Sequence, residues 1–256
     1  MSALDLARLV PEVRAIAREA GEVILRYYKD PISFEVKADG SPVTDADLAA
    51  EAVILPALHH LTPGIPVVAE ESFDAGARPV HGDTFWLVDA LDGTRAFIEH
   101  SDEFTVNIGL VVNGHPELGV IYIPAEEQLY WAAGPGTAAW STRHRSEHPI
   151  ATRQPAVEGL VVLTSRRHSD DRALADYLAH QPVLRRDLFS SSLKFCLIAR
   201  GMADLYPRFG ATCEWDTAAG HAILAAAGGR VETLDGAPLL YGKPGFDNPS
   251  FIAYGR

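Results

Sequence analysis

The chain has 256 residues, of which 47% are hydrophobic, so it is long enough to bury a large core and is not a short disulfide-stapled scaffold. Its 34 Asp and Glu residues outnumber its 22 Lys and Arg residues, and the formal net charge of −12 argues against a nucleic-acid polymer or an anionic membrane as partner. Fourteen of these acids, with three bases, lie within residues 35–103. This acidic block is either a solvated surface or a site that receives cations.

Cysteine content and hydropathy indicate the compartment. Two cysteines, Cys196 and Cys213, form neither a disulfide framework nor a metal-binding spacing, which favours a reducing environment and ordinary thiols. The N-terminus has no apolar run of signal-peptide length, and no stretch is apolar enough to cross a bilayer. We therefore expect a cytoplasmic protein without a transmembrane segment, with peripheral association to the inner membrane as an alternative.

In chain order, the first hundred residues are expected to form two helices and then two strands. Apolar residues at three- and four-residue spacings predict an amphipathic helix over residues 3–28. Thr44 is expected to cap a second helix over residues 45–61. Short apolar runs at 65–69 and 85–88 each end in acidic residues, which predicts strands that deliver carboxylates at their C-terminal ends.

The remainder of the chain changes pattern near its middle. Residues 104–141 predict an antiparallel meander with a hairpin at Asn113-Gly114. The polar segment 142–159 is a plausible boundary between an N-terminal half, residues 1–141, and a C-terminal half, residues 142–256. In the second half, short strands alternate with helices, which is typical of an α/β structure. The helices are predicted at about 170–180, 192–200 and 215–227.

The sharpest local feature is the sequence FWLVDALDGT at residues 85–94. Asp89 and Asp92 place two hard oxygen ligands in one turn, and the Leu91 carbonyl lies between them. Such a turn suits Mg²⁺, which binds carboxylate, carbonyl and water oxygens. The alternative is an Asp turn that only ends a strand.

Three further acidic groups stand at the ends of predicted elements: Glu70 with Glu71, Asp47, and Asp216. If these carboxylates converge with the Asp89 turn, their mutual repulsion requires a cation between them. Taken singly, each has an ordinary explanation as a solvated acid or a residue of a helix first turn. The other acids of the block are expected to stay on the solvated surface; they are Asp74, Asp83, Glu99, Asp102 and Glu103.

Four segments, SPVTDAD, VVAEES, FWLVDALDGTRAFI and EWDTAAG, resemble the signature set of the lithium-sensitive, magnesium-dependent inositol monophosphatase superfamily. The stretches EFTVNIGLVVNGHPELGVIYIPAEEQLYWA and SSLKFCLIARGMADLYPRFG are most similar to the 3'(2'),5'-bisphosphate nucleotidases of sulfur metabolism. The likeness runs over residues 15–253. It implies a layered αβαβα sandwich, an α+β fold of the sugar-phosphatase type, with the active site between the two halves.

The resemblance also implies roles for individual residues. Thr94 and Asp47 would orient the attacking water, while Glu71 would act from the outer shell. Two or three Mg²⁺ ions would be bound by Glu70, Asp89, the Leu91 carbonyl, Asp92 and Asp216. Ala90 stands where most members of the superfamily have proline, which loosens the turn without removing a ligand.

Substrate recognition is expected from the second half, where eight bases oppose five acids between residues 166 and 208. Cationic side chains suit a second phosphate. By resemblance, the nucleotide is contacted by His168, Ser191, Lys194 and Arg208, with Glu70, Asp92, Gly93, Thr94 and Asp216 completing the substrate site.

The sequence therefore predicts a hydrolase that removes the 3'-phosphate of 3'-phosphoadenosine 5'-phosphate, giving AMP and phosphate. The alternatives are an inositol monophosphatase or another sugar-phosphate phosphatase, such as one acting on fructose 1,6-bisphosphate, and a non-catalytic nucleotide sensor. The expected partner is a small phosphorylated nucleotide, and the chain is expected to be a monomer or a homodimer.

Overall fold

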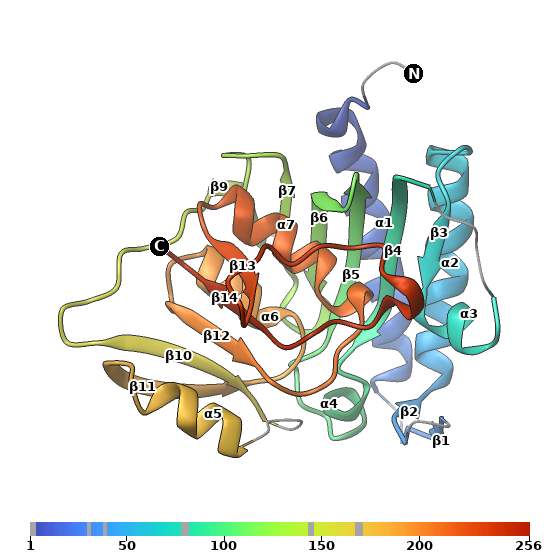
Figure 1. Ribbon diagram of the computed structural model, residues 1–256. Helices are drawn as coiled ribbons and strands as arrows, with labels where there is room; N and C mark the ends of the chain where they lie inside the picture. The colour runs from blue at the N-terminus through green and yellow to red at the C-terminus, as the bar shows by residue number, and fades with distance from the viewer. Residues whose placement is uncertain (1–3, 30–31, 38–39, 78–81, 143–145, 167–170) are drawn as a thin grey trace.

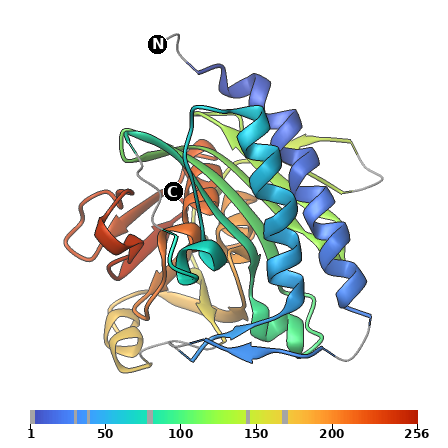
Figure 2. The ribbon, with the colours of Figure 1, turned by 90° about the vertical axis from the view of Figure 1, so that its right-hand side faces the viewer.

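Helices and sheets alternate in five layers, in the order helix, sheet, helix, sheet, helix (Figure 1). The computed structural model describes residues 4–29, 32–37, 40–77, 82–142, 146–166 and 171–256. The outer layer consists of α1 (Leu6–Tyr27) and α2 (Asp45–Leu61), which lie side by side on one face of the larger sheet (Figure 2). The predicted layered fold and the two predicted N-terminal helices are confirmed.

The larger sheet has seven strands in the order β3-β4-β5-β6-β7-β8-β9. β3 pairs in parallel with β4, and every other pairing in this sheet is antiparallel. Asn113 and Gly114 adopt φ values of 52° and 76°, so the predicted hairpin turn is present. The strands are β3 (Val67–Ala69), β4 (Thr84–Asp92), β5 (Thr105–Val112), β6 (His115–Ile123), β7 (Gln128–Ala133), β8 (Ala139–Thr142) and β9 (His148–Pro149).

The middle layer contains α6 (Leu193–Ala199) and α7 (Ala218–Ala226), which separate the two sheets. α7 approaches the larger sheet closely because the facing position on β5 is Gly109, where an added Cβ would lie 2.9 Å from the Ala219 nitrogen. Apolar residues from both sheets and both helices form one buried cluster. The division into halves at residue 142 stays a prediction.

The smaller sheet has five strands in the order β11-β10-β12-β14-β13, and α5 (Asp171–Leu178) covers its outer face. β10 is parallel to both of its neighbours, whereas β14 is antiparallel to both of its own. The two C-terminal strands were not anticipated from the sequence. The strands are β10 (Leu160–Ser165), β11 (Val183–Phe189), β12 (Leu205–Arg208), β13 (Arg230–Thr233) and β14 (Phe251–Tyr254).

Short elements connect the layers, and one of them corrects a prediction. The helix expected from residue 215 begins instead at Ala218, because Trp215 and Asp216 belong to a separate 3₁₀ turn. Asp216 accepts the backbone N–H of Cys213 at 2.8 Å, which closes this turn before the helix. The short elements are β1 (Glu35–Val36), β2 (Pro42–Val43), α3 (Glu70–Asp74), α4 (Thr94–Ile98), η1 (Pro124–Glu126), η2 (Glu214–Asp216) and η3 (Pro244–Phe246).

Candidate active site

A cavity of about 860 Å³ opens where the end of β4 meets the turn before α6 and the start of η2. Asp47 lies behind its wall, and His168 lies outside the described residues. All the other residues predicted to bind metal or substrate line the cavity; they are Glu70, Asp89, Leu91, Asp92, Gly93, Thr94, Ser191, Lys194, Arg208 and Asp216.

Local backbone geometry at the end of β4 places two of the carboxylates. Asp89 pairs with Asn107 and Asp92 pairs with Thr105, so β4 carries one more residue than β5 over this stretch. Such a bulge bends the strand and changes the direction of its side chains. The Leu91 N–H donates to the Asp89 carboxylate at 3.0 Å, which leaves the second oxygen of Asp89 uncommitted to this turn.

Three carboxylates converge in the cavity. Glu70, Asp89 and Asp216 each offer one oxygen, and these oxygens lie within 4.8 Å of one another. Burial raises the pKa of Asp89 well above its usual value, and the neighbouring Glu70, Asp92 and Asp216 raise it further. Burial raises the pKa of Asp216 in the same way, again with Asp92 and Glu70 contributing. The folded chain therefore holds these acids together against their mutual repulsion.

This donor set fits a divalent cation. Its oxygens are hard carboxylate ligands, close together and partly or fully buried, and carboxylate oxygens are ligands that Mg²⁺ prefers. A bound cation would relieve the repulsion that raises the carboxylate pKa values. Glu70, Asp89 and Asp216 are the residues that the geometry brings together, and Asp92 lines the same cavity.

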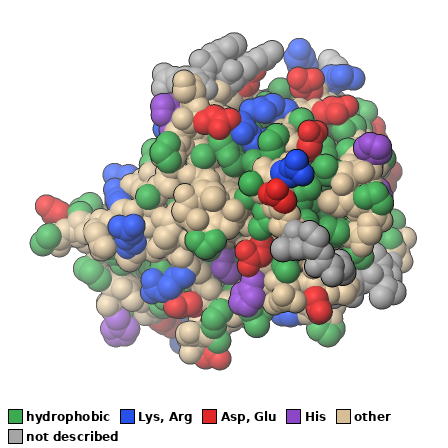
Figure 3. Space-filling view, turned by 90° about the horizontal axis from the view of Figure 1, so that it is seen from above, with side chains coloured by type: hydrophobic (Ala, Val, Ile, Leu, Met, Phe, Trp, Pro, Cys, Tyr) green, Lys and Arg blue, Asp and Glu red, His purple; other side chains and the backbone are tan. Residues whose placement is uncertain are grey.

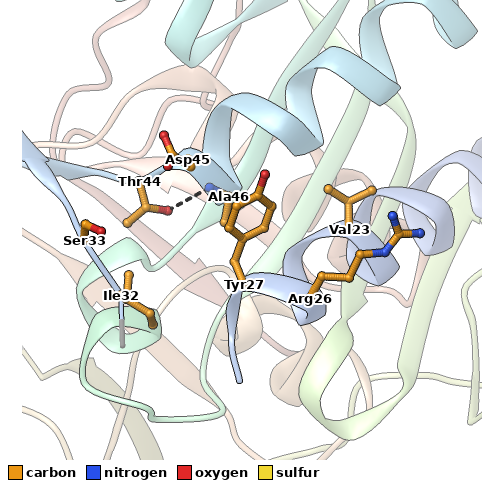
Figure 4. Close-up of a pocket in the computed structure, with 8 residues that line it drawn as sticks. All are labelled: Val23, Arg26, Tyr27, Ile32, Ser33, Thr44, Asp45 and Ala46. Carbon is orange, nitrogen blue, oxygen red and sulfur yellow. Dashed lines mark hydrogen bonds between the residues drawn. The ribbon is translucent and has the colours of Figure 1, made fainter. Parts of the chain in front are cut away.

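Thr94 and Asp47 form the expected hydrogen-bonded pair. The Thr94 hydroxyl donates to Asp47 Oδ1 at 2.9 Å, while Asp47 Oδ2 accepts the backbone N–H and the hydroxyl of Thr44 at 2.8 and 2.6 Å. Thr44 in turn caps α2 by accepting the Ala46 N–H (Figure 4). The capping box that begins α2 therefore also fixes the carboxylate that holds Thr94.

Figure 4 shows a second, smaller cavity of about 350 Å³ beside this cap. Tyr27 and Arg26 from the end of α1 border it, together with the first residues of α2. None of the residues predicted to bind metal or substrate lines this smaller cavity. Thr44 lines it and also binds the Asp47 carboxylate. It is distinct from the acidic cavity.

Lys37 is a cation of the site that sequence reasoning missed. Its ammonium donates to Glu70 at 2.8 Å and to Glu71 at 2.7 Å, and it lies 2.9 Å from Asp74. Although burial opposes the shift, these carboxylates raise the pKa of Lys37. The sequence did offer one signal for Lys37, because it is the single lysine within the acidic block of residues 35–103.

Burial raises the pKa of Glu70 to about 7, and that of Glu71 also to about 7, against the opposing effect of Lys37. Glu51 on α2 accepts the backbone N–H groups of Glu71 and Ser72, both at 3.0 Å, and the Ser72 hydroxyl. A buried acid of α2 thus fixes the start of α3, where Glu70 stands. No sequence motif marked Glu51.

The same cavity is also lined by two buried basic residues, Lys194 and Arg208. Lys194 is 2% exposed, and its ammonium donates to the carbonyls of Phe189 and Ser191 at 3.1 and 2.6 Å. Burial lowers its pKa to about 7. The Arg208 guanidinium donates to the Ser165 hydroxyl at 2.7 Å and to two backbone carbonyls. One ammonium hydrogen and two guanidinium hydrogens remain beyond these contacts, so both groups retain donors for a ligand.

Two of the acids expected on the solvated surface form ion pairs, although the Asp74 side chain is exposed, as expected. Asp74 pairs with Lys37, as described above. Glu103 binds the Arg166 guanidinium through both oxygens, at 2.6 and 3.0 Å, and accepts the Ser190 N–H at 2.8 Å. Although burial opposes it, these contacts lower the pKa of Glu103. On the face shown in Figure 3, acidic and basic side chains are intermixed.

Comparison with known proteins identifies the family of this chain. The sequence profile of the inositol monophosphatase family matches residues 5–252. The chain belongs to the inositol monophosphatase family. Among curated family members, it is 46% identical over 246 residues to the 3'(2'),5'-bisphosphate nucleotidase CysQ of Salmonella typhimurium, covering 95% of this chain and 98% of that protein. It is 40% identical to the CysQ protein of Buchnera aphidicola, over 96% and 93% of the two chains.

Solved structures of the family give the same picture. CysQ from Bacteroides thetaiotaomicron superposes with a TM-score of 0.80 at 35% identity, over 98% of each chain. Inositol monophosphatase from Anabaena superposes with a TM-score of 0.75 at 27% identity, over 98% of this chain and 91% of that one. Across the described residues of this family member, no helix has the length and apolarity needed to cross a membrane.

Proposed function

We propose that this family member is a magnesium-dependent 3'(2'),5'-bisphosphate nucleotidase that hydrolyses the 3'-phosphate of 3'-phosphoadenosine 5'-phosphate to AMP and phosphate. The observation that carries the proposal is one cavity lined both by a carboxylate cluster and by the buried cations Lys194 and Arg208. A substrate with two phosphates can place one against cations held by the carboxylates and the other against Lys194 and Arg208. The full-length similarity to proteins named for this activity supports the choice of substrate.

In this proposal Glu70, Asp89, Asp92, Asp216 and the Leu91 carbonyl hold two or three magnesium ions. When bound, magnesium supplies Lewis acidity that neutralises charge on the phosphoryl oxygens. Every other contribution to the reaction comes from side chains of this chain.

Thr94 and Asp47 orient the attacking water. Because the Thr94 hydroxyl donates its proton to Asp47, an oxygen lone pair of Thr94 is available to accept a proton from water in the cavity. Asp47 keeps this orientation because two donors from Thr44 hold its other oxygen. Water is the nucleophile, so no covalent enzyme intermediate forms.

Recognition of the nucleotide is assigned to Ser191, Lys194, Arg208 and His168. Lys194 and Arg208 supply positive charge to the second phosphate, and their burial strengthens this attraction because it removes competing water. The existing hydrogen bonds to carbonyls hold both cations in place before the substrate arrives.

Phosphate release by the purified protein tests the proposal. Substrates are 3'-phosphoadenosine 5'-phosphate, inositol 1-phosphate and fructose 1,6-bisphosphate, each with MgCl₂ and with EDTA. We expect kcat/KM to be highest for the nucleotide and to vanish in EDTA. A higher kcat/KM for either sugar phosphate rejects the nucleotide assignment, and tight nucleotide binding without turnover indicates a sensor.

A further inference from the structure

The Asp92 carboxylate is tied to the turn that carries the nucleotide-binding residues. Its Oδ2 atom accepts the backbone N–H of Ser192 at 2.6 Å and the side-chain amide of Asn107 at 3.3 Å. Ser192 directly follows Ser191 and stands at the start of α6, which carries Lys194. A predicted metal ligand and the predicted nucleotide site thus share one hydrogen-bond network.

Asn107 connects the two sides. Its Oδ1 atom accepts the Ser192 hydroxyl at 2.7 Å and the Thr105 hydroxyl at 3.0 Å, and these two hydroxyls lie 2.9 Å apart. The side-chain oxygen therefore faces the hydroxyls and the nitrogen faces Asp92, which orients the amide without ambiguity. Asn107, Thr105 and Ser192 are 1%, 0% and 2% exposed.

The turn held by this network is constrained from several directions. Ser191 has a φ of 54°, in the left-handed region that a serine adopts at an energetic cost. The Ser190 N–H is bound to Glu103, and Lys194 closes the turn on its inner side through the Ser191 carbonyl. Carboxylates of Asp92 and Glu103 therefore hold the N–H groups on both sides of Ser191.

Stability alone does not account for a buried polar side chain in this network. Asn107 is a buried polar residue of β5 whose side chain contacts the polar groups of Asp92, Thr105 and Ser192. Burying an amide gains little net free energy even when its hydrogen bonds are made. An apolar residue at this position would leave the Asp92 oxygen and the Ser192 hydroxyl without this partner.

We propose that Asn107, assisted by Thr105 and Ser192, is a positioning residue that couples cation binding at Asp92 to nucleotide binding at the turn around Ser191. The amide commits Asp92 Oδ2 to the turn and leaves Oδ1 for the cation. Whatever shifts Asp92 therefore shifts Ser191 and Lys194. This inference rests on the proposed function for the identity of the ligand.

Coupled binding is measured without turnover. Calorimetry gives the affinity for Mg²⁺ with and without the product AMP, and the affinity for AMP with and without Mg²⁺. By linkage, each ligand tightens the other by the same factor. We expect this factor to exceed about 5 in the wild type, the lower end of usual coupling factors, and to approach 1 in Asn107→Ala.

Kinetics provide a second readout. In Asn107→Ala, we expect the KM for the bisphosphate nucleotide and the Mg²⁺ concentration for half-maximal rate to rise about tenfold or more, the effect of losing one or two buried hydrogen bonds. The kcat for inositol 1-phosphate should change much less. A purely structural role would instead lower kcat for both substrates in the same proportion, with KM unchanged.

Matched variants separate positioning from stability. Thr105→Ser keeps the hydroxyl and should retain the wild-type coupling factor, whereas Thr105→Val removes it and should lose coupling even if Asn107→Ala fails to fold. Thr62→Val deletes another buried hydroxyl, the acceptor of the Trp86 indole N–H at 2.9 Å, at the opposite end of α2 from Asp47. It should lower stability and leave coupling intact.

A wild-type coupling factor of 1, or a factor unchanged in both Asn107→Ala and Thr105→Val, overturns the inference. So does a rise in the nucleotide KM without a rise in the Mg²⁺ requirement. Failure of the proposed function has a different signature, because the wild type then prefers another phosphomonoester. In that case the coupling factor is measured with the alcohol product of that substrate.

Discussion

Replacing Lys194 with Met removes a buried charge and keeps a side chain of similar length, so stability and substrate binding should change in opposite directions. Burial lowers the pKa of Lys194 from 10.5 to about 7. A shift of this size means that keeping Lys194 charged in the folded protein lowers the free energy of unfolding by about 5 kcal/mol below pH 7. The two lost hydrogen bonds from the ammonium to carbonyls are worth about 1.5 kcal/mol each, the lower end for a charged donor. The free energy of unfolding of Lys194→Met at pH 6 should therefore rise by about 2 kcal/mol.

The pH dependence of this difference has a definite sign. The pKa of Lys194 is lower in the folded protein than in the unfolded chain, where it is near 10.5. Between about pH 7 and pH 10.5 the unfolded chain binds more protons, so the wild type gains stability as the pH rises through this window. Lys194→Met lacks that gain, and its advantage should be largest below pH 7 and shrink above it. Urea unfolding at pH 6 and pH 9 measures both values.

Substrate binding should weaken in the same variant. A charge-assisted hydrogen bond to phosphate is worth about 1.5–3 kcal/mol, so the KM for the bisphosphate nucleotide should rise about 10- to 100-fold. Lys243→Met is the matched control, because the Lys243 ammonium lies 2.6 Å from the fully buried Glu214 carboxylate. That variant should lose stability and keep the nucleotide KM. The reasoning is refuted if Lys194→Met is less stable than the wild type at pH 6 or keeps the wild-type KM.

Three further substitutions test the acidic side of the cavity. Asp89→Asn should lower magnesium-dependent phosphate release at least about 100-fold, and in EDTA its melting temperature should exceed that of the wild type because one buried like charge is gone. Exposed Asp235→Asn should leave phosphate release unchanged, and a lower melting temperature for Asp89→Asn in EDTA would contradict the electrostatic argument. Glu51→Ala should lower the free energy of unfolding by about 2–4 kcal/mol, because it leaves two amide N–H groups without their acceptor. Glu51→Gln keeps an acceptor oxygen, so its loss in free energy of unfolding, measured in urea, should be less than half of that in Glu51→Ala. Equal losses in the two variants would show that the missing acceptor is not the cause. Gly93→Ala should cost about 1–3 kcal/mol in thermal unfolding, because Gly93 has a φ of 96° and its added Cβ would lie 2.9 Å from a backbone oxygen; an unchanged melting temperature would show that the turn can relax.

Short-range patterns in the sequence determined the elements that carry the site. Thr44 and Asp47 predict where α2 begins, and the capping box forms there. Asn113 and Gly114 form the expected hairpin turn. The apolar run before Asp89 predicts a strand that ends in carboxylates, and β4 is that strand. These features follow from residues a few positions apart, whose steric and hydrogen-bonding preferences act before any layer is packed.

Convergence of the carboxylates could be inferred only by resemblance, because Glu70, Asp89 and Asp216 lie on three separate elements. Because sequence patterns report only nearby residues, they also misplaced the start of α7. The pattern of residues around Trp215 favours a helix, but tertiary packing of the Trp215 ring with Phe73 and Phe246 accompanies a tighter 3₁₀ turn there. No periodicity indicates such a contact between distant segments.

The acidic block at residues 35–103 shows most clearly what each level decides. Its composition alone predicted an excess of negative charge and left open a solvated surface or a cation site. The folded chain divides the block: one group of acids faces the cavity, Asp74 pairs with Lys37, and Glu103 holds Arg166 and the Ser190 amide. The sequence determines how many charges there are and where each element begins. Only packing decides which charges meet, because the partners of a carboxylate are set by layers built from segments far apart in the chain.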